Sequence, residues 1–235
     1  MKKRLISMAM TLVMCLSLLP AAAVAAPVQP AGVEPAAAVS VKRAIKFDDV
    51  KESDWFYDGV QYTVRRGMFR GISPTEFGPT VKMTRAMVVQ ILYALANKPS
   101  VAKTHQFPDV KDGDWFASAV AWAVKNGVAS GYTDGRFGPN DTITREQLAV
   151  MLHGYRKKPA SNYPLKFVDA NKVSPWAKTA MQWAVENKLM SGTDKGQLLP
   201  INTATRAEGA VIMMNFHKRV VDPGHEHDNE LPMVP

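Results

Sequence analysis

Helical spacing of apolar residues predicts a first helix in each of three segments of the chain. In the clearest segment the apolar positions fall at i, i+4, i+7 and i+8, which places Trp115, Ala119, Trp122 and Ala123 on one face. Asp114 stands where an N-cap is expected, and Gly127 stands where a left-handed residue ends many helices. The segments 54–67 and 174–188 repeat the pattern. In the third segment Lys188 replaces the glycine, so we expect that helix to end differently.

A second helix is predicted to begin at a threonine in each segment. Thr144 with Gln147, and Thr205 with Glu208, match the capping box, in which two side chains satisfy each other's backbone donors. The equivalent position of the first segment is Met87, which removes half of the box. Apolar residues continue each pattern at helical spacing, so these faces are assigned to the core.

These patterns recur with a fixed period. The arginines that follow the capping threonines are spaced by 60 and 61 residues, and the Phe-x-Asp starts and the tryptophans keep the same step. We therefore predict an all-α protein of three tandem two-helix repeats, at 47–106, 107–166 and 167–221. A two-helix unit cannot bury both apolar faces alone, so the repeats are expected to close in pseudo-threefold fashion, with grooves between them.

The two ends of the chain have different compositions from the repeats. Three cations and an apolar run precede a small-residue cluster, which predicts a cleaved secretory signal peptide over 1–25. The single cysteine, Cys15, lies within it. Alanine, proline and valine dominate 26–46, which is typical of a flexible linker, and 222–235 reads as a disordered polar tail. We thus expect a secreted protein that has no contact with the membrane after cleavage.

Composition argues against several functional classes. The formal net charge is +8, and three of the positive charges belong to the predicted leader. A modest excess of this kind favours an anionic partner, but without a basic run or an RNA-binding motif we expect no nucleic acid partner. No serine or cysteine nucleophile signature is present, and His225 and His227 in the tail do not form a closed metal site. We expect no catalysis, no metal and no cofactor.

An arginine directly after each capping threonine is unusual, because a cation there opposes the positive end of the helix dipole at a cost of about 0.3–1 kcal/mol. One interpretation is an anion site made by the guanidinium and free N–H groups at the helix start. Glycines nearby would let a ligand approach the backbone. The other is that each arginine pairs with a local acid. The residues concerned are Arg85, Arg145 and Arg206, the glycines Gly71, Gly131 and Gly192, and the acids Asp49, Asp109 and Asp169.

The motifs resemble those of S-layer homology (SLH) repeats. The similarity rests on Phe-x-Asp-Val near a tryptophan, on the loop Gly-Tyr-x-Asp-Gly-x-Phe-x-Pro at 131–139, and on the helix starts Ile-Thr-Arg-Glu at 143–146 and Thr-Arg-Ala-Glu at 205–208. Three copies cover nearly all of the chain after the leader. Repeats one and three depart from the pattern at Met87 and at Leu198 and Leu199, so the three grooves are not expected to be equivalent.

This resemblance implies non-covalent anchoring to the Gram-positive cell wall, through secondary wall polysaccharides that often carry pyruvate ketals. It also implies that the three motif arginines recognise the anionic sugar between repeats. Repeat two matches the family best, so a groove with Gly131, Asp134 and Arg145 is our first choice. Trp115 and Trp176 are further ligand candidates, Trp176 as a stacking face, although a tryptophan at a helix start also suits the core.

Two other classes of function stay open at this point. An enzyme acting on wall sugars is one, although nearly every residue after the linker belongs to a repeat. The other is a small structural S-layer component or envelope adaptor that acts through contacts with other surface proteins. Assembly without wall polymer would favour the adaptor, whereas a monomer that sediments with cell walls would favour the anchor.

Overall fold

The computed structural model describes residues 45–102 and 107–224. The predicted signal peptide, nearly all of the predicted linker and most of the predicted tail, including His225 and His227, lie outside these residues. Within them the fold is all-α, as expected, and β-structure is limited to isolated bridges. No helix in this part of the chain has the length and apolar character needed to cross a membrane.

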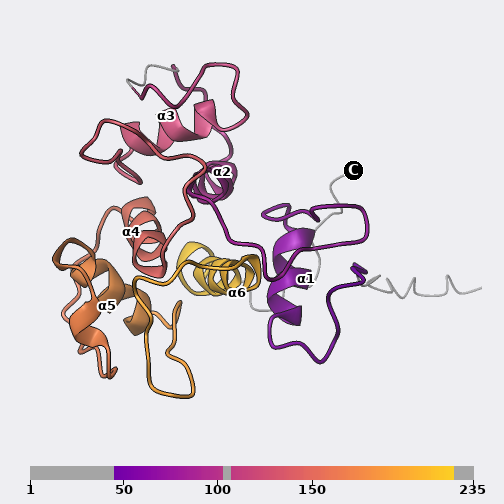
Figure 1. Ribbon diagram of the computed structural model, residues 1–235, viewed down its shortest axis with the longest axis vertical. Helices are drawn as coiled ribbons and strands as arrows, with labels where there is room; N and C mark the ends of the chain where they lie inside the picture. Colours follow the sequence, from indigo (N-terminus) through magenta and orange to yellow (C-terminus); the bar gives the residue numbers. More distant parts are fainter. Residues whose placement is uncertain (1–44, 103–106, 225–235) are drawn as a thin grey trace, which may run out of the picture. The chain divides into compact units, whose positions relative to one another are not determined.

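Each repeat supplies two α-helices (Figure 1). The first helices are α1 (Tyr57–Arg65), α3 (Ala117–Lys125) and α5 (Lys178–Glu186). The second helices are α2 (Arg85–Leu95), α4 (Arg145–Tyr155) and α6 (Arg206–Phe216). Repeat three also has the short 3-10 helices η1 (Ala170–Lys172) and η2 (Pro175–Ala177), and the π-helical turn η3 (His217–Val221) follows α6.

The second helices start as the sequence predicts. Complete capping boxes form at Thr144 and Thr205, while Thr84 only accepts a bond from the backbone of Met87. The first helices start later than expected, and Asp114 does not cap α3. Its carboxylate instead accepts a 2.7 Å bond from the backbone of Lys111, because residues 114–117 form a turn before the helix begins.

The ends of the first helices share one conformation. Gly67 and Gly127 have φ of 67° and 66°, which confirms the left-handed cap. Lys188 adopts the same conformation at φ 55°, so the expectation of a different ending was wrong. The backbone bonds from Lys188 to Val185 and from Leu189 to Ala184 match those of the glycine ends, and they hold the lysine in this conformation.

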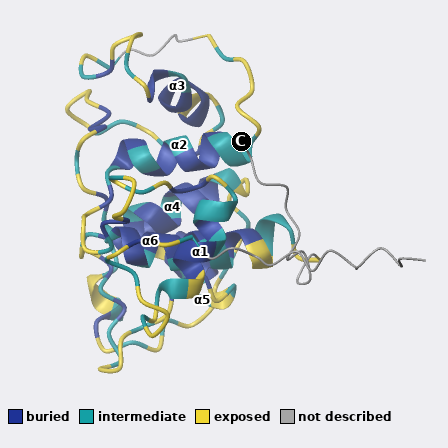
Figure 2. Ribbon diagram, turned by 90° about the vertical axis from the view of Figure 1, so that its right-hand side faces the viewer, coloured by how far each residue is buried: buried dark blue, intermediate teal, exposed yellow. Residues whose placement is uncertain are grey.

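Neighbouring repeats pack through their helices. Each first helix packs against the second helix of the preceding repeat in a closed cycle, so that α3 lies on α2, α5 on α4 and α1 on α6. Figure 2 shows that the helices bury their inner faces, and the core includes Trp122 and Trp183, as expected. We call the three contacts the 1–2, 2–3 and 3–1 interfaces, after the repeats that they join.

A cycle of backbone hydrogen bonds closes the pseudo-threefold arrangement. Met83 donates to the carbonyl of Ala204, Ala204 donates to Ile143, and Ile143 donates to Met83, each over 2.9 Å. All three residues are fully buried. Each lies two residues before the start of a second helix, so the cycle fixes the helix starts next to one another. The predicted pseudo-threefold closure is therefore confirmed.

Candidate functional site

The motif arginines join neighbouring repeats. At the 3–1 interface, Arg206 Nε donates to the carbonyl of Phe77 over 2.9 Å and Nη2 donates to that of Arg70 over 2.6 Å. Arg85 binds Phe137 and Ser130 of repeat two in the same way, and Arg145 binds Leu198 and Ser191 of repeat three. Each guanidinium thus clamps the loop of the next repeat with two charge-assisted hydrogen bonds.

The guanidinium groups also lie against aromatic rings. Arg206 is 4.6 Å from the ring centroid of Phe77, and Arg85 is 4.6 Å from that of Tyr132. Such contacts are favourable between a cation and the face of a ring. Burial lowers the pKa of Arg85, Arg145 and Arg206 from the ordinary arginine value.

The helix starts are not open anion sites. The N–H groups of Arg85 and Ala86 donate to the carbonyls of Asp141 and Pro139, each over 3.0 Å, and the other two second helices bind the next loop in the same manner. The premise that these N–H groups are free was therefore wrong. The loop carbonyls occupy them because the same closure that buries the helix starts must satisfy their donors.

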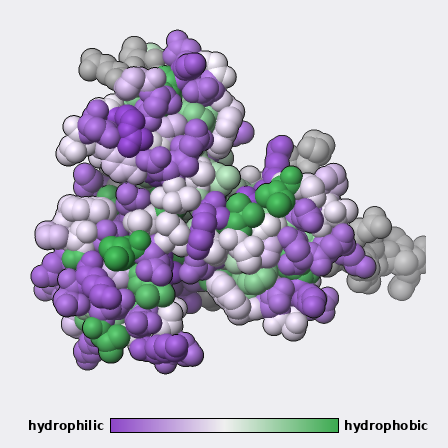
Figure 3. All heavy atoms as spheres, viewed as in Figure 1, coloured by the Kyte–Doolittle hydropathy of each residue, from purple (hydrophilic) through white to green (hydrophobic). Residues whose placement is uncertain are grey.

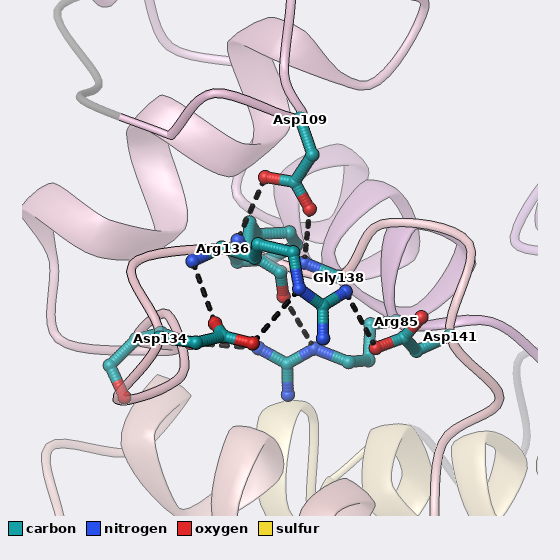
Figure 4. Close-up of polar contacts among 8 residues, drawn as sticks. Arg85, Asp109, Asp134, Arg136, Gly138 and Asp141 are labelled. Atoms are coloured by element: carbon teal, nitrogen blue, oxygen red, sulfur yellow. Dashed lines mark hydrogen bonds and ion pairs between the residues drawn. The ribbon is translucent and has the colours of Figure 1, made fainter.

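The repeated aspartates order the loops and do not pair directly with the motif arginines. Asp109 accepts bonds of 2.9 and 2.8 Å from the N–H groups of Phe137 and Gly138, as Figure 4 shows. Asp49 and Asp169 bind their own loops equivalently. Burial acts to raise the pKa of Asp169, but its backbone bonds outweigh this and the pKa lies below the ordinary value.

The groove chosen first from the sequence is not assembled. The loop that carries Gly131 and Asp134 packs on Arg85, whereas Arg145 packs on the loop of repeat three. Asp134 is exposed and pairs with Arg136 over 2.9 Å, and the same guanidinium lies 3.5 Å from Asp141 (Figure 4). Sequence spacing could not reveal this, because the carbonyls of each loop accept hydrogen bonds from the arginine of the preceding repeat.

The regular recurrence of the loop glycines in the three repeats has a packing cause. A Cβ at Gly131 would meet the ring of Phe107 and the carbonyl of Arg136. A Cβ at Gly71 or Gly192 would likewise meet the phenylalanine that opens the same repeat. The sides of these glycines where a side chain would stand are thus filled by protein.

The tryptophans at the starts of the repeats are exposed. Trp55, Trp115 and Trp176 have exposed fractions of 67%, 62% and 60%. The interpretation that they fill the core was wrong, because each helix begins two residues beyond the tryptophan and the ring precedes its buried face. On the face drawn in Figure 3, hydrophobic atoms form small separate groups among hydrophilic ones.

An open pocket of about 390 Å³ lies at the 3–1 interface. It combines an exposed aromatic face, two carboxylates, a lysine and the start of α6, and its lining residues are Asp49, Lys51, Asp54, Trp55, Phe56, Pro79, Thr80, Thr205 and Ala207. Sequence reasoning missed Lys51 and Asp54. Their signal was the recurrence of the same pair at Lys111 and Asp114 of repeat two.

Similarity to known proteins agrees with this architecture. The S-layer homology domain family matches residues 46–86, 106–149 and 166–210. The exoglucanase XynX of Acetivibrio thermocellus is 32% identical over 181 residues, which cover 74% of this chain and 16% of that protein. The surface-layer 125 kDa protein of Lysinibacillus sphaericus is 31% identical over 180 residues, covering 75% of this chain and 15% of that protein.

A cellulosome-anchoring protein of Acetivibrio thermocellus is 29% identical over 141 residues, which cover 57% of this chain and 31% of that protein. The chain thus spans a minor part of the relatives that it matches. Each matched segment runs from the start of a repeat into its second helix, and it contains the first helix, the aspartate-ordered loop and the buried arginine. The chain therefore belongs to the S-layer homology domain family.

Proposed function

We propose that this protein attaches non-covalently to the bacterial cell wall by binding an anionic, pyruvylated secondary wall polysaccharide between its repeats. The observation that carries the proposal is the pocket at the 3–1 interface, which joins Trp55 and Lys51 to the start of α6. Attachment of this kind places the protein at the cell surface. Membership of the S-layer homology family supports it.

The lining of the pocket suits an acidic sugar. The exposed ring of Trp55 offers an apolar face on which a pyranose can stack. Asp49 Oδ1 and Oδ2 are held by the loop N–H groups, and Asp54 Oδ2 accepts a 2.8 Å bond from the N–H of Lys51, so Asp54 offers its Oδ1 to a sugar hydroxyl. The ammonium group of Lys51 can pair with the carboxylate of a ketal.

The acids around the buried motif arginines also favour the 3–1 interface as the binding site for an anion. Near Arg206 the acid that influences its pKa is Asp49, whose carboxylate already binds the loop. Arg145 has a second acidic neighbour, because Glu208 Oε1 lies 3.6 Å from its Nη1. Fewer acids therefore lie near Arg206 than near Arg145, and an anion at the 3–1 interface meets less competition from the protein's own carboxylates. The arginines act here through the local potential and through the geometry of the groove.

Co-sedimentation with purified cell walls tests this function. We expect the chain without its predicted leader to sediment with intact walls, and to stay in solution with walls stripped of their secondary polymer. Trp55→Ala should reduce the fraction that sediments with intact walls, whereas Tyr163→Ala, which removes an exposed aromatic ring outside the pocket, should not. Thermal unfolding of both variants serves as the folding control.

The other outcomes identify the alternatives. Equal sedimentation with stripped walls would overturn polymer binding and point to peptidoglycan. Self-assembly without any wall material would instead favour a structural S-layer or adaptor role. The proposal includes no catalytic step, so incubation with the wall polymer should release no reducing sugar.

A further inference from the structure

One residue distinguishes the 2–3 interface from the other two. The position after each motif arginine holds Ala86 in α2, Glu146 in α4 and Ala207 in α6. Glu146 is buried, with an exposed fraction of 4%. Its Oε2 accepts a 3.0 Å bond from the N–H of Ser174, and its Oε1 accepts a 2.8 Å bond from the Ser174 hydroxyl.

The carboxylate of Glu146 crosses the 2–3 interface at the position that corresponds to the pocket of the 3–1 interface. At the 3–1 interface Ala207 lines the pocket beside Thr205 and Trp55, and its methyl group leaves room in front of the helix start. At the 2–3 interface the longer side chain of Glu146 reaches from α4 to the residue before η2. Since η2 carries Trp176, the carboxylate lies between the helix start and that tryptophan's turn.

The charge of Glu146 opposes an anionic ligand at the 2–3 interface, as does the size of its side chain. Glu146 brings a negative charge to the start of α4, and Glu208 lies 3.6 Å from Arg145 on the same interface. A ligand carboxylate entering there would meet two acids, and it would have to displace the bonds that Ser174 gives to Glu146. Breaking charge-assisted hydrogen bonds of this kind is costly.

We propose that Glu146 is a built-in occupant of the 2–3 interface, which stands in for the carboxylate of a ligand and excludes acidic sugars from this groove. Anionic saccharide then binds at the 1–2 and 3–1 interfaces, where alanine holds the equivalent position. The inference rests on the proposed function, and it assigns to one residue the control of how many grooves are used.

The indole N–H signals of the tryptophans report each interface separately. Trp55, Trp115 and Trp176 mark the 3–1, 1–2 and 2–3 interfaces, while Trp122 and Trp183 are buried references. The probe is a methyl hexoside with a pyruvate ketal, titrated into the chain without its predicted leader, and the same hexoside without the ketal is the control. Tryptophan-to-phenylalanine variants assign the signals.

In the wild-type protein we expect saturable shifts of the Trp55 and Trp115 signals and none of Trp176. Glu146→Ala should add a shift of Trp176, with a dissociation constant within about tenfold of that at Trp55. The reciprocal change, Ala207→Glu, should abolish the shift of Trp55 and leave that of Trp115. This second variant tests the inference even if Glu146→Ala does not fold.

The results separate two kinds of failure. A wild-type protein in which no exposed tryptophan responds overturns the proposed function itself. A wild-type protein whose Trp176 signal responds like that of Trp55 overturns the role of Glu146 alone. The same holds if Trp176 stays silent in a folded Glu146→Ala variant, or if Ala207→Glu leaves the Trp55 response unchanged.

Discussion

Replacing Arg206 by lysine tests whether the motif arginine is a structural clamp. Arg206 satisfies two carbonyls of repeat one from two nitrogens of one planar group, and it stacks on Phe77 at 4.6 Å. A lysine places all its N–H donors on one nitrogen, which cannot occupy the positions of both Nε and Nη2, so one of the carbonyls of Phe77 and Arg70 loses its donor. The charge is kept, which isolates the geometry of the group from its electrostatics.

The size of the effect follows from these contacts. A buried carbonyl left without a partner costs about 1–3 kcal/mol, and the lost ring contact costs about 0.5–2 kcal/mol. We therefore expect Arg206→Lys to lower the free energy of unfolding by about 1.5–5 kcal/mol. For a domain of this size that corresponds to a melting temperature about 3–20 °C lower.

Urea unfolding followed by circular dichroism measures this loss. Arg136→Lys is the matched control, because that guanidinium is exposed and its ion pairs lie at the surface, so its unfolding midpoint should not change. If Arg206→Lys unfolds at the wild-type midpoint, the clamp is not a source of stability. The arginine would then act mainly on the ligand, and any loss of wall binding in such variants would be a direct effect.

Three further outcomes follow from the structure. Asp169→Asn should reduce the loss of stability that the protein shows as the pH is lowered. A carboxylate whose pKa is lowered by folding stabilises the fold above about pH 4, and this contribution is lost as the pH falls through the pKa of the folded state. A pH dependence of stability identical to that of the wild type would contradict this. Lys188→Gly should raise the melting temperature. Lys188 has a left-handed backbone conformation at φ 55°, which glycine adopts without steric strain, so the free energy of unfolding should increase by about 1 kcal/mol. A lower melting temperature would show that the lysine side chain is needed. Wall binding should weaken as salt rises, because it depends in part on exposed cations such as Lys51; equal affinity at low and high salt would argue against this.

The local structure of the repeats could be predicted from the sequence because its causes are local. A threonine followed three residues later by Gln147 or Glu208 satisfies its own helix start, whatever surrounds it. The period of the motif arginines likewise required three equivalent units. Lys188 was misjudged because residue type indicates only a preference for a conformation, and the backbone bonds of the helix end overrode that preference.

The candidate site was less predictable because it depends on partners in other repeats. Periodicity identifies the apolar face of α1, but not that this face packs on α6. In the same way, a cation at a helix start is visible in the sequence, whereas the carbonyls of Phe77 and Arg70 that receive it are not. The exposure of Trp55 depended on a helix start two residues beyond it. Glu146, by contrast, can be found by aligning the three repeats.

Binding of an acidic wall saccharide between repeats can be measured by calorimetric titration of the chain with purified secondary wall polymer, before and after mild acid removal of its pyruvate ketals. We expect saturable binding of the native polymer and an affinity at least about tenfold weaker once the carboxylates are gone. Equal affinity for the two polymers would contradict this expectation.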